Sequence, residues 1–102
     1  MNNRESFHKQ LKKVCDNVYY QPPSDIKLKY PCIIYQDNML AQKYANNKLY
    51  STFMGYRVMV IDKDPEGYIE KKILENFIYA RWQSRYIRDN LNHTVLLVYF
   101  NY

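Results

Sequence analysis

The densest group of potential metal ligands is an acidic stretch between residues 62 and 70. Its four carboxylates belong to Asp62, Asp64, Glu66 and Glu70. The spacing is similar to the opening of a calcium-binding loop, but Ile73 stands where that loop needs a bidentate acid, and a strand is expected where it has a helix. A strand end followed by a capped helix explains the same acids. We therefore expect no metal site here, and a divalent ion bridging Asp62 and Asp64 is the alternative.

The two cysteines and two histidines are the other residues that could bind a metal or act as nucleophiles. His8 and Cys15 fall on one expected helix, but seven residues separate them by about 10 Å along its axis, too far to share a metal. Neither Cys15 nor Cys32 lies in a motif that activates a thiol, and His93 has no acidic neighbour except Asp89 across a turn. We expect buried thiols of a reducing compartment, no catalytic residue and no cofactor; a cysteine–histidine pair is the alternative.

A stretch near the C-terminus interleaves cations with aromatic residues, a combination that binds single-stranded nucleic acid. It contains Arg81, Trp82, Arg85, Tyr86 and Arg88. Regular alternation would place both aromatic residues on one face of a strand and Arg81 and Arg85 on the other. We therefore prefer an aromatic core face opposite a solvated basic face. Nucleic-acid binding stays an alternative that the formal net charge of +5 permits.

Tyrosine dominates the composition, with twelve copies among 102 residues against only two glycines. A tyrosine ring is large, rigid and polar at one end, which favours burial against another protein. Strands are also rich in tyrosine, and for any single residue that explanation is the stronger. The longest apolar run, Val95 to Phe100, is far too short to cross a membrane, and no apolar run follows the N-terminus. We expect a soluble, non-secreted protein that assembles with others and is not an enzyme.

Two helices are expected. Phe7, Leu11 and Val14 recur at helical spacing, which predicts an amphipathic helix over residues 4–16 with a basic outer face. The sequence Asp64-Pro65-Glu66 predicts the start of a second helix over about residues 65–77, since it combines a capping carboxylate, a first-turn proline and an acid that complements the helix dipole. Three lysines of the first helix are candidate contacts with a partner protein: Lys9, Lys12 and Lys13.

Four segments have the β-branched and aromatic content of strands, at residues 32–35, 52–62, 80–88 and 93–100. A turn at Asp89-Asn90 makes the last two a C-terminal hairpin of about residues 80–100. The last segment is apolar on both faces, which predicts a central strand covered on both sides. The expected fold is α+β: an antiparallel or mixed β-sheet packed with two α-helices in a single small domain of residues 1–102.

The segment from residue 37 to residue 50 has no clear period, and we expect a long connection or an irregular hairpin there. Connections of this length are often functional. Because their tyrosines and asparagines belong to no regular element, four residues are candidate contacts with a partner protein: Tyr44, Asn46, Asn47 and Tyr50. Replacement of both tyrosines with alanine should leave the monomer folded and impair its assembly.

Three segments together resemble a family of small tailed-bacteriophage proteins known as tail terminator or tail completion proteins. They are Asn17 to Pro23 continuing to Lys29–Tyr35, Tyr56 to Pro65, and Arg85-Tyr86 followed by Asp89–His93 and an apolar strand. They span most of the chain in the order of the family. The resemblance implies a non-enzymatic α+β subunit of a six-fold ring that caps the tail tube and joins it to the neck. The family has no catalytic residues that could be assigned to positions of this chain.

The resemblance also implies partners and a location. The implied partners are further copies of this chain in a ring homo-oligomer, the tail tube protein, and a neck or connector protein, with non-specific contact with phage DNA in the lumen. The implied location is the tail or neck of the virion, after assembly in the host cytoplasm. Two alternatives are a head-tail connector or stopper of the same particle, and a small basic nucleic-acid-binding protein, which salt-sensitive DNA binding by an isolated monomer would favour.

Overall fold

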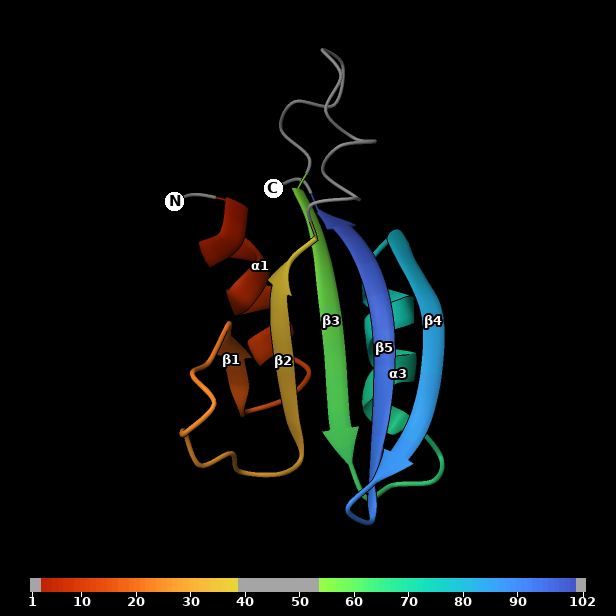
Figure 1. Cartoon of the computed structure of the whole chain (residues 1–102). Helices are drawn as coiled ribbons and strands as arrows, with labels where there is room; N and C mark the ends of the chain where they lie inside the picture. The colour runs from red at the N-terminus through yellow and green to blue at the C-terminus, as the bar shows by residue number, and fades with distance from the viewer. Residues whose placement is uncertain (1–2, 39–53, 101–102) are drawn as a thin grey trace.

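The computed structural model describes residues 3–38 and 54–100, and it folds as an α+β domain (Figure 1). The predicted fold class is therefore confirmed. The candidate contacts Tyr44, Asn46, Asn47 and Tyr50 lie outside the described residues. Along the chain the elements are α1 (Asn3–Lys12), β1 (Val18–Tyr20), β2 (Cys32–Asp37), β3 (Met54–Asp62), α3 (Tyr68–Asn76), β4 (Tyr79–Arg88) and β5 (Leu91–Phe100).

The strands form one mixed sheet in the order β1-β2-β3-β5-β4. β1 pairs in parallel with β2, and the other three pairings are antiparallel. β5 is a central strand, as predicted, because β3 pairs with one of its edges and β4 with the other. The two edge strands are therefore β1, with three residues, and β4, with ten.

Both helices pack on the same face of the sheet, which is the far face in Figure 1. α1 contributes Phe7 and Leu11 to the main core, and α3 contributes Ile69 and Ile73. The sheet residues that meet them are buried: Ile33, Tyr35, Tyr56, Val58, Val60, Leu96 and Val98. This confirms the predicted buried face of β3, because Tyr56, Val58 and Val60 all point toward the helices.

The second face of the sheet has no described helix against it. Near β2 it carries a smaller cluster of Cys32, Ile61 and Leu91, against which Leu28 of the 21–31 connection packs. Farther along β5, Val95 is buried on this face, whereas Leu97 and Tyr99 are half-buried. The prediction that β5 is covered on both sides therefore holds for the helix face and only in part for the second face.

The second helix begins later than Asp64-Pro65-Glu66 predicts. α3 starts at Tyr68, and Gly67 is its N-cap in the left-handed region at φ 66°. Only glycine fits there without strain, and a Cβ at this position would also collide with the Glu70 side chain. Asp64 still binds backbone donors as a cap would: its carboxylate accepts from Glu66 N at 2.9 Å and from Tyr68 N at 3.3 Å. These bonds stabilise a turn that precedes the helix.

β4 contains a β-bulge that the regular alternation of its sequence does not predict. Trp82 pairs with Leu96 and Ser84 pairs with the next residue, Val95, so Gln83 has no partner on β5. Because of this extra residue, the side chains from Ser84 onward point to the faces opposite to those that regular alternation predicts. Tyr86 therefore pairs with His93 on the face away from the helices, while Trp82 faces the helix side. The prediction that Trp82 and Tyr86 share one face is wrong.

Candidate interaction surfaces

The potential metal ligands and the two thiols can be located among the described residues. No group of three or more His, Cys, Asp or Glu among them is placed to hold a metal ion. Cys15 and Cys32 are free and buried, as predicted. Burial raises the pKa of the Cys32 thiol to about 12 and also raises that of Cys15, so neither thiolate forms readily at neutral pH. No helix in the described part of the chain is long and apolar enough to span a membrane.

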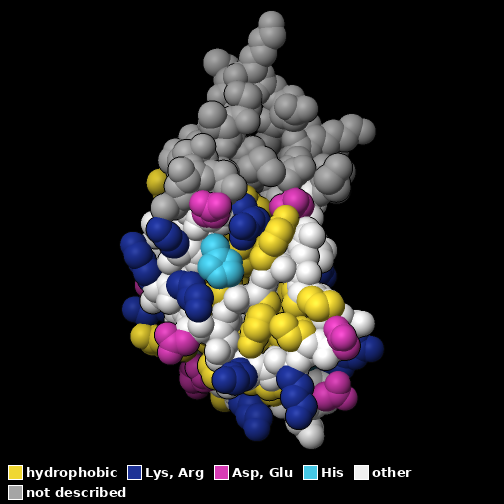
Figure 2. All heavy atoms as spheres, turned by 90° about the vertical axis from the view of Figure 1, so that its left-hand side faces the viewer, with side chains coloured by type: hydrophobic (Ala, Val, Ile, Leu, Met, Phe, Trp, Pro, Cys, Tyr) yellow, Lys and Arg dark blue, Asp and Glu magenta, His cyan; other side chains and the backbone are white. Residues whose placement is uncertain are grey.

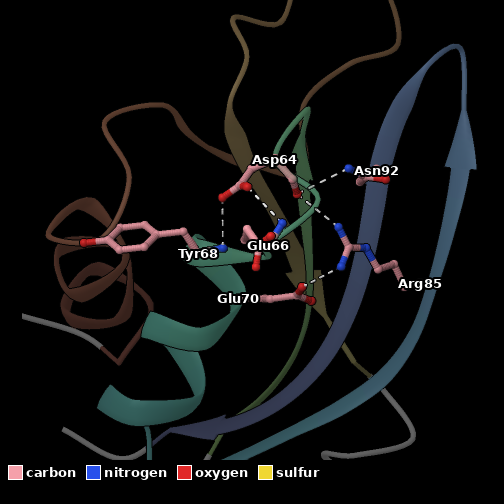
Figure 3. Close-up of polar contacts among 6 residues, drawn as sticks. All are labelled: Asp64, Glu66, Tyr68, Glu70, Arg85 and Asn92. Atoms are coloured by element: carbon pink, nitrogen blue, oxygen red, sulfur yellow. Dashed lines mark hydrogen bonds and ion pairs between the residues drawn. The ribbon is translucent and has the colours of Figure 1, made fainter.

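The acidic stretch forms a polar cluster that joins α3 to β4 and β5 (Figure 3). Arg85 of β4 lies at its centre. Its Nη1 contacts Glu70 Oε1 at 3.2 Å, and its Nη2 donates to the Asp64 carbonyl at 3.1 Å. Asn92 Nδ2 donates to the same carbonyl at 3.3 Å. These bonds fix the turn before α3 against the sheet, so Asp64 and Glu70 have a structural role here.

Glu70 and Asp62 are the two buried acids of this region. The second carboxylate oxygen of Glu70 is buried without a hydrogen-bond partner, so this side chain depends on Arg85 for its charge compensation. Burial raises the pKa of the Asp62 carboxyl, and the negative charge of Asp64 raises it further. With Tyr30 and Tyr68 these two aspartates line an open cleft of about 600 Å³.

Replacing Arg85 with alanine is expected to lower the free energy of unfolding by about 3 kcal/mol, because Glu70 would be left as a buried carboxylate without its cation. Urea denaturation measures this change. Arg81→Ala on the same strand is the matched control: Arg81 is exposed and has no ion pair with any described residue, so a change within about 0.5 kcal/mol is expected. Equal losses for the two variants would contradict the structural role of Arg85.

A second polar cluster joins α1 to β1 and β2. The hydroxyl of buried Tyr35 lies 2.7 Å from His8 Nδ1 and accepts from Arg4 Nη1 at 3.4 Å. The Arg4 guanidinium also lies over the Tyr20 ring, 4.7 Å from its centre, and the Tyr20 hydroxyl donates to Asp37 Oδ2 at 3.1 Å. Because Arg4 donates to the Tyr35 oxygen, the hydroxyl proton is available to His8, which accepts it with an unprotonated Nδ1.

This geometry makes stability depend on the protonation of His8. Burial lowers the pKa of His8 below its ordinary value of 6.5, and the positive charges of Arg4 and Lys12 lower it further. The unfolded chain therefore binds the proton more readily than the folded one. The contribution of neutral His8 is fully present above pH 6.5 and is lost as the pH falls through the lower pKa of the folded state.

We therefore expect the free energy of unfolding to decrease on acidification below pH 6.5, and the His8→Gln variant to show a smaller decrease. Urea denaturation between pH 7.5 and pH 5 measures both. Gln10→Ala is the control, since Gln10 is exposed on the same helix, carries no titratable group and leaves the contact between His8 and Tyr35 intact, so this variant should keep the slope of the original chain. Identical pH profiles for His8→Gln and the original chain would rule out this role of His8.

The three lysines at the end of α1 that were predicted to contact a partner protein lie on its solvent-exposed side, away from the cluster around Tyr35. Lys9, Lys12 and Lys13 are all exposed, and Lys12 Nζ donates to the Asp16 carbonyl at 3.1 Å. Figure 2 shows Lys and Arg side chains spread over this side of the molecule, with Asp and Glu side chains among them. The structure thus places all three at the surface, together with the basic face predicted for the first helix.

Several of the most exposed large apolar side chains lie on β4 and just before it. Ile78 is 91% exposed, Ile87 is 73% exposed and Trp82 is 51% exposed. The register places Trp82 and Ile87 on the helix side of β4, and Ile78 directly precedes that strand. We call Ile78, Trp82 and Ile87 the lateral patch. Its members form a row along about 30 Å of the sheet edge, with Ala80 and Arg85 between them, and not one continuous apolar area.

The opposite edge of the sheet carries an open hollow of about 470 Å³ whose lining is mixed, polar and apolar. It lies between the 21–31 connection and β2, and we call it the edge hollow. Its lining residues are Gln21, Pro22, Pro23, Ser24, Ile26, Leu28, Ile34 and Gln36. Figure 2, which looks at this side of the molecule, shows hydrophobic side chains with charged side chains around them. Apolar side chains are therefore accessible at both ends of the strand order.

The remaining surface of interest is the side of β3, β5 and β4 that faces away from the helices, which we call the open face. Tyr86 and His93 stack on it with ring centres 4.9 Å apart and planes within 9°. At the strand positions of this face that the structure describes, no Asp, Glu or Lys occurs. Its accessible side chains are Arg57, Met59, Tyr79, Arg81, Ser84, Tyr86, Arg88, His93, Leu97 and Tyr99.

Sequence reasoning missed both surfaces of β4. Ile78 and Ile87 were not candidates, because an apolar residue in a strand is usually buried, and only the position of β4 at the edge exposes them. The grouping of Arg81, Tyr86 and Arg88 depends on the bulge at Gln83, for which the sequence gives no clear signal. No protein-family model matches this chain, and no match was found among curated proteins or solved structures.

Proposed function

We propose that this protein is a non-catalytic structural subunit that assembles head-to-tail with copies of itself into a closed ring. By its resemblance to the tail terminator proteins of tailed bacteriophages, the ring would be six-fold, cap the tail tube and join it to the neck. The observation that carries the proposal is the lateral patch, whose three large apolar side chains lie exposed along one edge of the sheet, where a neighbouring subunit would cover them.

The positions of the two apolar surfaces support a ring rather than a two-fold dimer. The lateral patch lies at the β4 edge of the sheet and the edge hollow lies at the β1–β2 edge, so the two surfaces are on opposite sides of one subunit (Figure 1). A contact between two different surfaces repeats from copy to copy and closes into a ring when the rotation permits. Trp82, as an exposed aromatic side chain with a polar N–H group, suits a hollow lined by proline and aliphatic residues together with Gln21, Ser24 and Gln36.

Continuation of the sheet from copy to copy is the less favourable way to join subunits. β1 is only three residues long and leads into Gln21-Pro22-Pro23, which shortens and blunts that edge. At the other edge, pairing of two β4 strands would bring the arginines of both copies together. Side-chain contacts between the lateral patch and the edge hollow avoid both difficulties.

The test of this proposal is the native mass of the purified full chain at concentrations from 1 to 100 µM. A discrete ring of six copies is the expected result, and electron microscopy of particles that contain the protein should place it between the tail tube and the neck. A chain that stays monomeric over the whole range, with no position in the particle, would overturn the proposal. A discrete ring found at the head side of the neck would identify a connector or stopper instead.

A further inference from the structure

Arginine and lysine are segregated in this chain. It contains five arginines and ten lysines, and four of the arginines lie on β3 and β4, where there is no lysine. Three of these four, Arg57, Arg81 and Arg88, belong to the open face. No described residue forms an ion pair with any of the three. The open face is therefore a positively charged surface without carboxylates of its own.

The arginines of the open face are arranged around aromatic rings. Arg57 and Arg81 both pair with Leu97, from opposite sides, so they stand in one row about 10 Å apart, two strand spacings. Farther along β4, Tyr86 is 40% exposed and lies against His93, and Arg88 follows two positions later on the same face. The order along the strand is cation, aromatic ring, cation.

We infer that the open face binds single-stranded nucleic acid, with phosphates at Arg57, Arg81 and Arg88 and a base stacked on Tyr86. A planar guanidinium binds phosphate through two parallel hydrogen bonds, which explains arginine rather than lysine at these positions. Aromatic side chains on a sheet provide stacking platforms for unpaired bases of any sequence. The absence of carboxylates from the strand positions of this face makes it complementary to a polyanion.

A single strand fits this surface better than a duplex or a protein. Duplex DNA hides its bases, and its grooves admit a helix or a two-stranded ribbon, whereas the open face spans three strands, β3, β5 and β4. An acidic protein surface would satisfy the arginines without using the exposed ring of Tyr86. The open face is also separate from the lateral patch, because Trp82 and Ile87 face the helix side of β4. This inference therefore does not depend on the formation of a ring.

The experiment measures fluorescence anisotropy of a labelled twenty-nucleotide thymidine strand titrated with the full chain at 50 to 200 mM salt. Each of Arg57→Ala, Arg81→Ala and Arg88→Ala should weaken binding and reduce the slope of log affinity against log salt by about 0.7. Tyr86→Ala should weaken binding about 5- to 100-fold with the salt slope unchanged, since it removes stacking and no charge. Lys71→Ala on α3 is the matched control for charge and should change binding little.

Three outcomes would overturn the inference: no binding at 50 mM salt, tighter binding of the corresponding duplex, or binding that is lost in a Lys9→Ala, Lys12→Ala, Lys13→Ala variant but kept in the three arginine variants. Native mass is measured on every variant in parallel. Rings that form without binding the strand would contradict this inference alone, and binding by a monomeric chain would contradict the ring alone. Far-ultraviolet circular dichroism confirms that each variant is folded.

Discussion

Replacement of Phe7 with alanine is expected to lower the free energy of unfolding by about 4 kcal/mol. The Phe7 ring is fully buried and connects the helices with the sheet. It stacks on Tyr56 with ring centres 4.2 Å apart, and its centre lies 5.4 Å from those of both Tyr35 and Phe77. Removal of the ring leaves a cavity where α1, α3, β2 and β3 meet, and these elements cannot all move to fill it.

Urea denaturation of the Phe7→Ala variant measures this loss, with the m-value expected to be unchanged. Domains of this size are typically stable by about 5–15 kcal/mol, so the variant should keep about 1–11 kcal/mol and unfold at a much lower urea concentration than the original chain. Phe7→Leu keeps most of the volume and should lose no more than about 1.5 kcal/mol. A loss below 1 kcal/mol for Phe7→Ala would mean that α1 does not pack as described.

Replacement of Trp82 with alanine is expected to weaken self-association at least 30-fold while the subunit stays folded. Trp82 has half of its side chain exposed at an edge strand, so it contributes little to the core and much to a contact surface. Buried tryptophans at protein interfaces commonly contribute 2 kcal/mol or more, and ring closure repeats that loss at every contact. Analytical ultracentrifugation measures the association, and Gln83→Ala, the neighbouring unpaired residue of the bulge, is the matched control.

A mixing experiment separates a head-to-tail contact from a two-fold one. Ile26→Lys places a charge in the edge hollow, and we expect it to abolish assembly as Trp82→Ala does. Each variant then keeps one intact surface. A mixture of the two should form heterodimers and no larger species, because only one productive contact exists between them. If the mixture stays monomeric while each variant is folded, the lateral patch and the edge hollow do not bind each other.

The periodicity of apolar residues was sufficient to predict the elements and the fold class, because burial on one face of the sheet determines that pattern. Tyr56, Val58 and Val60 alternate as a strand requires, and Phe7 and Leu11 repeat as a helix requires. The start of α3 was misplaced, since Asp64 caps a turn as readily as a helix and the left-handed Gly67 comes in between. Local capping chemistry alone does not distinguish these two arrangements.

The surfaces could be predicted only in part. The exposure of Lys9, Lys12 and Lys13 could be predicted from the helical period, because the side of an amphipathic helix opposite its apolar stripe faces solvent. The lateral patch could not be predicted, since the exposure of Ile78 and Ile87 depends on which strand lies at the edge of the sheet, and strand order is set by contacts between distant segments. The open face could not be predicted either, because the unpaired residue Gln83 changes the face to which each later side chain of β4 points.

That unpaired residue, Gln83, has a consequence for how the protein can change over evolutionary time. Deletion of this one residue would remove the bulge and leave every other side chain of β4 on its present face, because Trp82 and Ser84 would become consecutive partners of Leu96 and Val95. Regular pairing of Gln83 with Val95, without the bulge, would instead turn Arg85 and Ile87 to the helix-free side and Tyr86 and Arg88 to the helix side. The lateral patch would then lose a member, and the open face would lose its ring and a cation. The separation of the two surfaces is therefore encoded by the register of the strand as much as by its composition.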